Sequence, residues 1–108
     1  MNNVSLVGRL TKDPKISEVD IKRDRKKEKL VIARFTLAVD RIGDGVDFIS
    51  CVAFGKSAEF IEEYFFKGMK AAVTGSIQTG SYENKEGDTV YTTDVKVDRI
   101  EFCEKKEK

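Results

Sequence analysis

The sequence predicts an all-β domain that contains a single short helix. Over most of the chain, apolar and polar residues alternate with the period of two that is typical of half-buried strands. Turn signals rich in Gly, Asp and Asn separate these segments. Only residues 57–68 change to helical spacing, and a chain of 108 residues has the size of one domain with one core.

Three strands are predicted before the helix. The first covers residues 4–10 and ends at the turn around Pro14. Residues 16–21 suggest only a weak extension of a hairpin, so the second strand is placed at residues 30–39. A short turn with two glycines, at residues 42–45, supplies the positive φ that a hairpin needs, and the third strand follows over residues 46–55.

The third strand carries two aromatic residues on one face. Phe48 and Phe54 lie on that face with small residues between them, whereas Ile49, Cys51 and Ala53 form the opposite, core-facing side. Two flat rings on an otherwise small face either pack against another surface or provide a stacking platform. The function of the protein depends on which of these is correct.

The helix and two further strands complete the expected order. Ser57 is the predicted N-cap of the helix, and Lys67 with Gly68 its predicted C-terminal end. The fourth strand is expected over residues 70–81, and the fifth follows the next turn. The apolar pattern of the fifth strand changes phase partway, which predicts a β-bulge near Asp98.

Composition argues against an enzyme and against a metal protein. The chain has no His, and its Asp and Glu residues are mixed with Lys and Arg on polar faces, where solvated charges usually lie. Cys51 and Cys103 lack metal-type spacing and are expected to be buried in a reducing compartment. We therefore expect no catalytic residues, no metal and no cofactor. No apolar run is long enough to span a bilayer, so we expect no membrane contact and a cytoplasmic location.

The charge is balanced overall but unevenly distributed. A net charge of +1 with 36% charged residues gives no argument for nucleic-acid binding from overall basicity. Residues 22–29, KRDRKKEK, nevertheless carry six basic and two acidic side chains. This segment is either a solvated hairpin tip or a flexible basic finger that contacts phosphates.

Three strands, a helix and two strands are the order of an oligonucleotide/oligosaccharide-binding (OB) fold. This is a five-stranded Greek-key barrel, here with one helix between strands three and four. Sequence motifs add a resemblance: MNNVSLVGRLTKDP at 1–14, FTLAVDR at 35–41, DFISCVAFGKSAE at 47–59, YFFKG at 64–68, VTGSIQTGSY at 73–82 and VYTTDVKV at 90–97. In this order and over nearly the whole chain, they resemble the bacterial single-stranded DNA-binding protein family.

The resemblance implies a binding site for single-stranded DNA. Phe48, Phe54 and Tyr82 fall where the family has aromatic residues that stack on bases, although core or subunit-interface packing is the alternative for each. Cations are expected beside the phosphate path, with plain solvated charge as their alternative role. They are Arg9, Lys12, Arg34, Arg41, Lys56 and Lys70 on strands and loops, and Lys22, Arg23, Arg25, Lys26, Lys27 and Lys29 in the basic finger.

The sequence departs from the family pattern in three places. Gly43 lies in a short turn where the family usually has a further aromatic residue, and the first hairpin is longer and more basic than usual. The family usually ends in a long flexible tail with an acidic, apolar tip that recruits other proteins, whereas this sequence ends in EKKEK. Either the tail was trimmed or the protein is a tailless variant, so tail-mediated partners are not expected. The expected organisation is a DNA-binding domain at residues 1–103 and a short charged end at residues 104–108.

The expected function is non-catalytic binding of single-stranded DNA without strong sequence preference, protecting the strand during replication, recombination and repair. A homotetramer is expected, with a dimer as the alternative, located in the cytoplasm with the nucleoid. Two other functions stay open: a tailless primosomal adaptor of the same fold, and a barrel that binds a protein or an oligosaccharide. The FGKSAE segment argues against the first, and salt-sensitive binding to oligo-dT would exclude the second.

Overall fold

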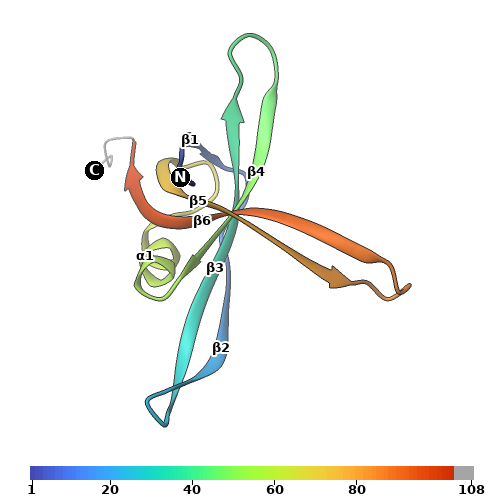
Figure 1. The fold of residues 1–108 in the computed structure, drawn as a ribbon. Coiled ribbons are helices and arrows are strands. Elements are labelled where there is room, and N and C mark those ends of the chain that lie inside the picture. Colours follow the sequence, from blue (N-terminus) through green and yellow to red (C-terminus); the bar gives the residue numbers. More distant parts are fainter. Residues whose placement is uncertain (104–108) are drawn as a thin grey trace.

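The structure is a computed structural model that describes residues 1–103, which form six strands and one helix (Figure 1). Strands β1 (Val4–Leu10), β2 (Lys15–Arg23), β3 (Lys26–Asp40) and β4 (Val46–Phe54) precede the helix α1 (Lys56–Tyr64). Strands β5 (Lys70–Glu83) and β6 (Thr89–Phe102) follow it. The predicted charged end at residues 104–108 lies outside the described residues.

Five of these strands close into a barrel. The sheet order is β1-β5-β6-β4-β3-β2, and β1 pairs in addition with β3, for example at Arg9 and Ala38. Strands β4 and β6 pair in parallel at Cys51 and Val95, whereas the other pairings are antiparallel. Without β2, the ring runs β1-β3-β4-β6-β5 and returns to β1. The predicted fold, an all-β OB barrel with one helix, is confirmed.

One strand was missed by the sequence prediction. Residues 15–23 form β2, which pairs with β3 from Lys15 opposite Arg34 to Arg23 opposite Lys26. Strand β3 therefore begins at Lys26 rather than at residue 30. The pattern near the hairpin tip is weak because neither face is buried there, so charged residues occupy both. The helix lies between the fourth and fifth of the six strands, which are the third and fourth strands of the barrel.

The helix begins and ends earlier than its predicted caps. Its N-cap is Gly55, with a φ of 63°, so Ser57 lies inside the first turn and caps nothing. The glycine allows β4 to turn directly into the helix, because an L side chain rarely adopts this backbone conformation. The helix ends at Tyr64, and the extended residue Phe65 turns its side chain into the core. Gly68 belongs instead to the connection that leads to β5.

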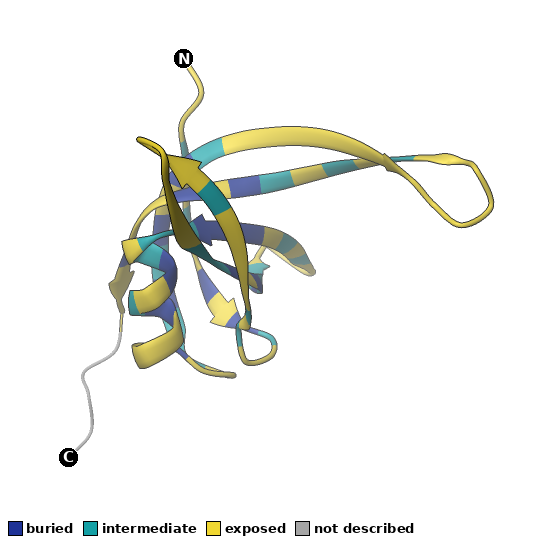
Figure 2. Ribbon diagram, turned by 90° about the horizontal axis from the view of Figure 1, so that it is seen from below, coloured by how far each residue is buried: buried dark blue, intermediate teal, exposed yellow. Residues whose placement is uncertain are grey.

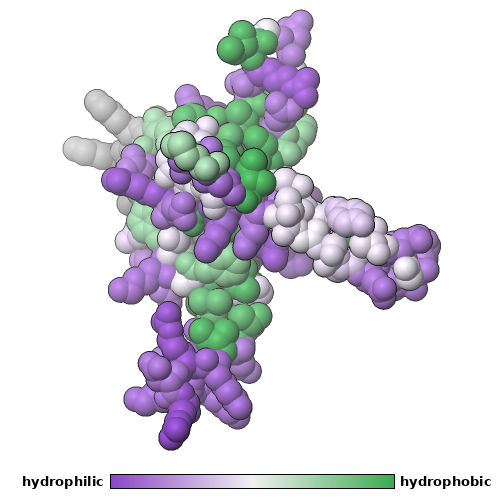
Figure 3. All heavy atoms as spheres, in the orientation of Figure 1, coloured by the Kyte–Doolittle hydropathy of each residue, from purple (hydrophilic) through white to green (hydrophobic). Residues whose placement is uncertain are grey.

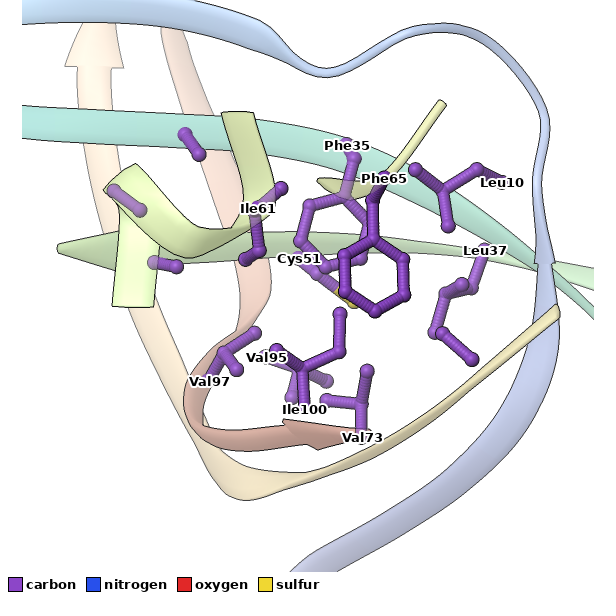
Figure 4. Packing of buried hydrophobic residues seen from close by; sticks show 14 residues of the cluster. Leu10, Phe35, Leu37, Cys51, Ile61, Phe65, Val73, Val95, Val97 and Ile100 are labelled. Carbon is purple, nitrogen blue, oxygen red and sulfur yellow. The ribbon is translucent and has the colours of Figure 1, made fainter. Parts of the chain in front are cut away.

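The core fills the barrel interior and extends beneath α1. Figure 4 shows Ile61 and Phe65, from the helix and the residue after it, among inward-facing strand residues such as Leu37 and Val73. On β6 the inward pattern changes phase, because Arg99 pairs with Thr74 while Val97 pairs with Gly75. Asp98 is the extra residue between them, so the predicted bulge is confirmed.

Three hairpins extend from the barrel, formed by β2 and β3, by β3 and β4, and by β5 and β6 (Figure 1). Their outer parts are largely exposed, and buried residues concentrate where the strands meet in the barrel (Figure 2). We call residues 18–31, where β2 and β3 extend beyond the pairing with β4, the β2–β3 arm. Within residues 1–103, no helix is long and apolar enough to cross a membrane.

The two cysteines differ in exposure, so the prediction that both are buried was wrong for one of them. Cys51 is buried in the barrel, and burial, together with the negative charge of Asp94, raises the pKa of its thiol to about 12. Cys103 is exposed, because it follows the last residue of β6 and no element within residues 1–103 covers it. The apolar residues just before Cys103 suggested burial.

We expect a thiol reagent to modify Cys103 rapidly in the native protein and Cys51 only after unfolding, because the thiolate is the reactive form. Mass spectrometry after brief labelling at pH 8 should show one adduct per chain, and two in denaturant. A Cys103→Ser variant should take up no label while folded. Rapid double labelling of the native protein would contradict the burial of Cys51.

Candidate nucleic-acid interface

The outer face of β3 and β4 carries two of the three predicted stacking residues. Inward residues of both strands fill the core, so the alternate residues point outward. By register, Phe48 lies opposite Ala38 and Phe54 opposite Ile32. The two rings are separated along the strand by about 20 Å, at roughly 3.4 Å per residue. This arrangement, with Phe48 and Phe54 outward, is called the aromatic face below.

Both rings are accessible, to different degrees. Phe48 is 70% exposed, and Phe54 is half-buried near the point where β4 meets the helix. Neither ring belongs to the hydrophobic core or to the partly buried residues packed against it. An exposed Phe side chain on the outside of a closed barrel keeps apolar surface in contact with water and adds little to the stability of the fold. Its ring surface is therefore available to a ligand.

Tyr82 lies on an extension of the same outer surface. Val95 faces the core, so alternation along β6 places Asp94 and Lys96 on the outward side. By the same alternation Val90 is outward, and so is Tyr82, its register partner on β5. The Tyr82 side chain is 57% exposed. The three predicted aromatic residues therefore share one side of the sheet, with Tyr82 on the hairpin of β5 and β6.

A cleft of about 220 Å³ is lined in part by Ser50, which lies on the same face of β4 as Phe48 and Phe54. Its polar lining comes from the segment between β1 and β2, the first residue of β2, the outer faces of β3 and β4, and β6, and it reaches inward to the core residues Phe35 and Cys51. The polar side chains are Thr11, Lys12, Asp13, Lys15, Arg34, Thr36, Ser50 and Asp94. The carboxylate of Asp13 accepts a hydrogen bond from the backbone N–H of Lys67 at 2.8 Å, which anchors the segment after β1.

The remaining barrel cations lie at different places. Arg9 is paired in register with Lys70 on one side and with Ala38 on the other, which puts it in the same row across the sheet as Phe48. Its guanidinium donates a hydrogen bond to the carbonyl of Gly68 at 2.9 Å. Lys56 is exposed at the first residue of the helix, two residues after Phe54.

Arg41 is held by an acidic neighbour. Its guanidinium donates two hydrogen bonds to one oxygen of the Asp47 carboxylate, at 3.0 and 2.7 Å. These hydrogen bonds, with a smaller contribution from the charge of Arg41, keep the pKa of Asp47 below its ordinary value. The charge of Arg41 is thus partly compensated across the hairpin of β3 and β4.

The six cations of the basic finger lie in the outer part of the β2–β3 arm, whose tip extends away from the barrel (Figure 1). Lys22 faces Lys27 across the hairpin, and Arg23 faces Lys26. Like charges directly opposite one another destabilise a strand pair. At the turn, Asp24 and Arg25 both have positive φ, of 50° and 65°, which non-glycine residues rarely adopt. The tip therefore keeps its cations at a cost in folding stability.

Sequence analysis missed three charged outward residues at or beside this surface. Lys15 and Asp94 line the cleft, and Lys96 is paired in register with Val52 of β4. The alternation of Val95 and Val97 could have identified Asp94 and Lys96. Tyr91 is also exposed, but the register puts it on the opposite side of the β5 and β6 hairpin from Tyr82.

A closed five-stranded barrel with an aromatic and cationic outer surface defines a protein of the OB class. The profile of the single-strand binding protein family matches residues 1–103. This chain belongs to that family.

Similar proteins support the same assignment. A single-stranded DNA-binding protein of Clostridium perfringens is 49% identical over 106 residues, which cover 96% of this chain and 67% of that protein. The single-stranded DNA-binding protein 1 of Staphylococcus aureus is 41% identical over 98% of this chain and 67% of its own length. A protein of the same name from Streptococcus pyogenes is 41% identical over 99% of this chain and 82% of its own length.

Proposed function

We propose that residues 1–103 form a domain that binds single-stranded DNA with little sequence preference and takes part in replication, recombination and repair by protecting the exposed strand. The observation that carries this proposal is the aromatic face beside a cationic cleft, in a chain of the single-strand binding protein family. Binding of this kind is non-catalytic. A protein with this function would lie in the cytoplasm, with the nucleoid.

Stacking supplies the contact with the bases. Phe48, Phe54 and Tyr82 offer ring surfaces on one side of the sheet, and every base has a π-face, so stacking tolerates any sequence. Each base stacked on an aromatic ring contributes about 1–3 kcal/mol, as judged from alanine substitutions. Phe48 is the strongest candidate among the three, because its ring is the most exposed.

Phosphate contacts supply the electrostatic part of binding. Lys12 and Arg34 line the cleft, and Arg9 and Lys70 continue the row that contains Phe48. We assign Lys56 and the six tip cations to the ends of the same path. Arg41 contributes less, because Asp47 already accepts its hydrogen bonds.

We infer a homotetramer, with a dimer as the alternative. Strand β1 is at one edge of the sheet, and over most of its length it pairs only with β5. Val7 on this strand and Ile77 and Tyr91 on the hairpin of β5 and β6 are exposed apolar residues that a second copy could cover. The mass of the particle in solution tests this inference directly.

Binding to oligo-dT is expected to weaken as salt rises, with a log–log slope of about −0.7 for each neutralised phosphate. Affinity for single strands should exceed affinity for duplex DNA at every salt concentration, because paired and stacked bases cannot reach the aromatic face. Fluorescence titration at several salt concentrations measures both quantities. Equal affinity for duplex and single strands would indicate a generic basic surface and would refute the proposal.

Replacing Lys26 and Lys27 with Gln is expected to lower affinity for long oligonucleotides and to reduce the salt slope. The reduction should reach roughly 1.4 units, at about 0.7 per lost phosphate contact. Oligonucleotides that fill only the aromatic face should bind as before. The same titration series measures each change.

A matched variant, Asp20→Asn with Glu28→Gln, removes two negative charges from the same arm in place of two positive ones. It should leave the salt slope of long oligonucleotides unchanged, since no phosphate contact is lost. If instead the Lys26 and Lys27 variant changes the particle mass and not the slope, the tip serves contacts between subunits.

A further inference from the structure

A cluster of aromatic rings lies where the end of α1 meets the end of β6, outside the two strands that carry the aromatic face. The ring of Phe102 stacks on that of Phe65, with the ring centroids 4.7 Å apart and an angle of 9° between the planes. The rings of Phe60 and Tyr64 lie 5.7 and 6.2 Å from that of Phe102. Of the four rings, only that of Phe65 is buried, so the cluster reaches from the core to the molecular surface.

The rings of Tyr64 and Phe102 remain accessible. Tyr64 is 41% exposed and Phe102 is 48% exposed, so no element within residues 1–103 covers their outer parts. On the side of the molecule that carries α1, hydrophobic and hydrophilic side chains are intermixed, whereas the tip of the β2–β3 arm is uniformly hydrophilic (Figure 3). Exposed apolar surface with a polar rim is typical of interaction sites, and the proposed function uses neither ring.

Acidic side chains border these rings. Glu59 and Glu63 lie four residues apart and therefore form one row along α1. Glu63 is also three residues after Phe60, so the acidic row is next to the row formed by Phe60 and Tyr64. Both carboxylates are exposed, and neither forms an ion pair within residues 1–103. The accessible rings thus have negative charge beside them.

This negative charge lowers the stability of the helix. Like charges four residues apart on a helix repel each other. Glu63 in addition lies in the last turn, at the negative end of the helix dipole, where a cation is favoured. Residues 61–64 include no basic side chain, and Lys56, the one basic residue of α1, is at the opposite end. The helix therefore keeps the two carboxylates at a cost that a cationic partner would offset.

We propose that this surface, made of Glu59, Glu63, Tyr64 and Phe102, binds an Arg- or Lys-rich segment of a partner protein. Three features select a cation: the two carboxylates, the negative end of the helix dipole, and the two exposed rings, which attract a guanidinium or ammonium group. Arg suits the surface best, because its planar guanidinium stacks on rings and pairs with carboxylates. The same negative charge repels phosphates, so the inference goes beyond DNA binding and does not depend on it.

The test titrates the full chain, without DNA, into a fluorescent peptide of sequence Leu-Arg-Arg-Leu-Arg-Arg-Leu and follows the polarisation of the peptide. Saturable binding is expected. Glu59→Gln together with Glu63→Gln should lower the affinity for the peptide by about three- to tenfold, as expected for the loss of two exposed ion pairs. The control, Glu83→Gln together with Glu86→Gln, removes the same two charges from the hairpin of β5 and β6 and should leave this affinity unchanged.

A second pair of variants tests the rings. Tyr64→Leu keeps an apolar side chain but removes the ring, so affinity for the peptide should fall by about two- to fivefold. Tyr91→Leu makes the same change at a Tyr that is 82% exposed on β6, and it should have no effect. A fluorophore attached to the exposed thiol of Cys103, the residue after Phe102, should change its emission when the peptide binds. A thermal melt of each variant shows that it is folded.

Absence of saturable binding would overturn the inference. Equal losses in the two pairs of glutamate variants would also overturn it, because they would indicate a general attraction to negative charge. A changed particle mass of the Glu59 and Glu63 variant would do the same, by showing that the surface joins two copies. Binding that requires removal of residues 104–108 would assign the surface to the end of the chain instead of a partner. Failure of the unaltered protein to bind oligo-dT would refute only the proposed function.

Discussion

Replacement of Phe48 with Ala is expected to weaken binding to oligo-dT by about 1–3 kcal/mol, because it removes a stacking surface. The thermal stability of the protein should be nearly unchanged, since the ring is 70% exposed and lies outside the core. Fluorescence titration measures the affinity, and a thermal melt measures the stability of the same variant. Unchanged affinity would exclude a stacking role, and a collapse in melting temperature would show that Phe48 supports the fold.

Phe66 provides a matched control for this experiment. It is 60% exposed and lies in the connection between α1 and β5, outside the two strands that carry the aromatic face, so Phe66→Ala should leave DNA affinity unchanged. Phe54→Ala should weaken binding in the same direction as Phe48→Ala. A larger loss of stability is expected there, because the Phe54 ring is half-buried beside the start of the helix.

Gly75→Ala is expected to destabilise the fold by at least about 2 kcal/mol, because the added methyl group overpacks a site where only backbone can yield. A Cβ at this position would lie 2.0 Å from the carbonyl oxygen of Lys96 and 2.9 Å from its carbonyl carbon. These atoms belong to the β5 and β6 pair at the bulge, where the register shifts. Chemical denaturation measures the loss in the free energy of unfolding.

Gly80→Ala is the control on the same strand. A Cβ at Gly80 would meet only the Thr92 side-chain oxygen, at 3.1 Å, and that side chain can rotate. We therefore expect a change of less than about 1 kcal/mol at this position. Equal destabilisation by the two variants would show that loss of glycine in β5, rather than contact with Lys96, is responsible.

Part of the site could be predicted from local pattern. Phe48 and Phe54 were placed on one face because a strand alternates strictly, and register with β3 confirms that they face outward together. The Asp98 bulge was predicted for the same reason, since a phase change in an alternating pattern requires an extra residue. Where one face of a strand is buried, the order of apolar residues is sufficient to predict which side chains face outward.

Other features could not be predicted because they depend on which residues the tertiary structure brings next to one another. The weak pattern at residues 16–21 gave no evidence of the full strand β2, whose partners are residues of β3 that are equally exposed. Cys103 has an apolar residue before it, but its exposure depends on where β6 ends. Arg41 was expected to contact phosphate, and only the folded hairpin brings Asp47 within hydrogen-bond distance of it.

The sequence by itself determined the class of fold, the order of the five barrel strands and the helix, and the two outward rings of β4, because these follow from periodicity and turn chemistry within single segments. The tertiary structure alone decided which cations line the cleft, that Asp47 compensates Arg41, and that β2 extends the sheet beyond the barrel. These properties arise from strand register, which joins residues far apart in the chain, and a one-residue shift in register would put each side chain on the opposite face.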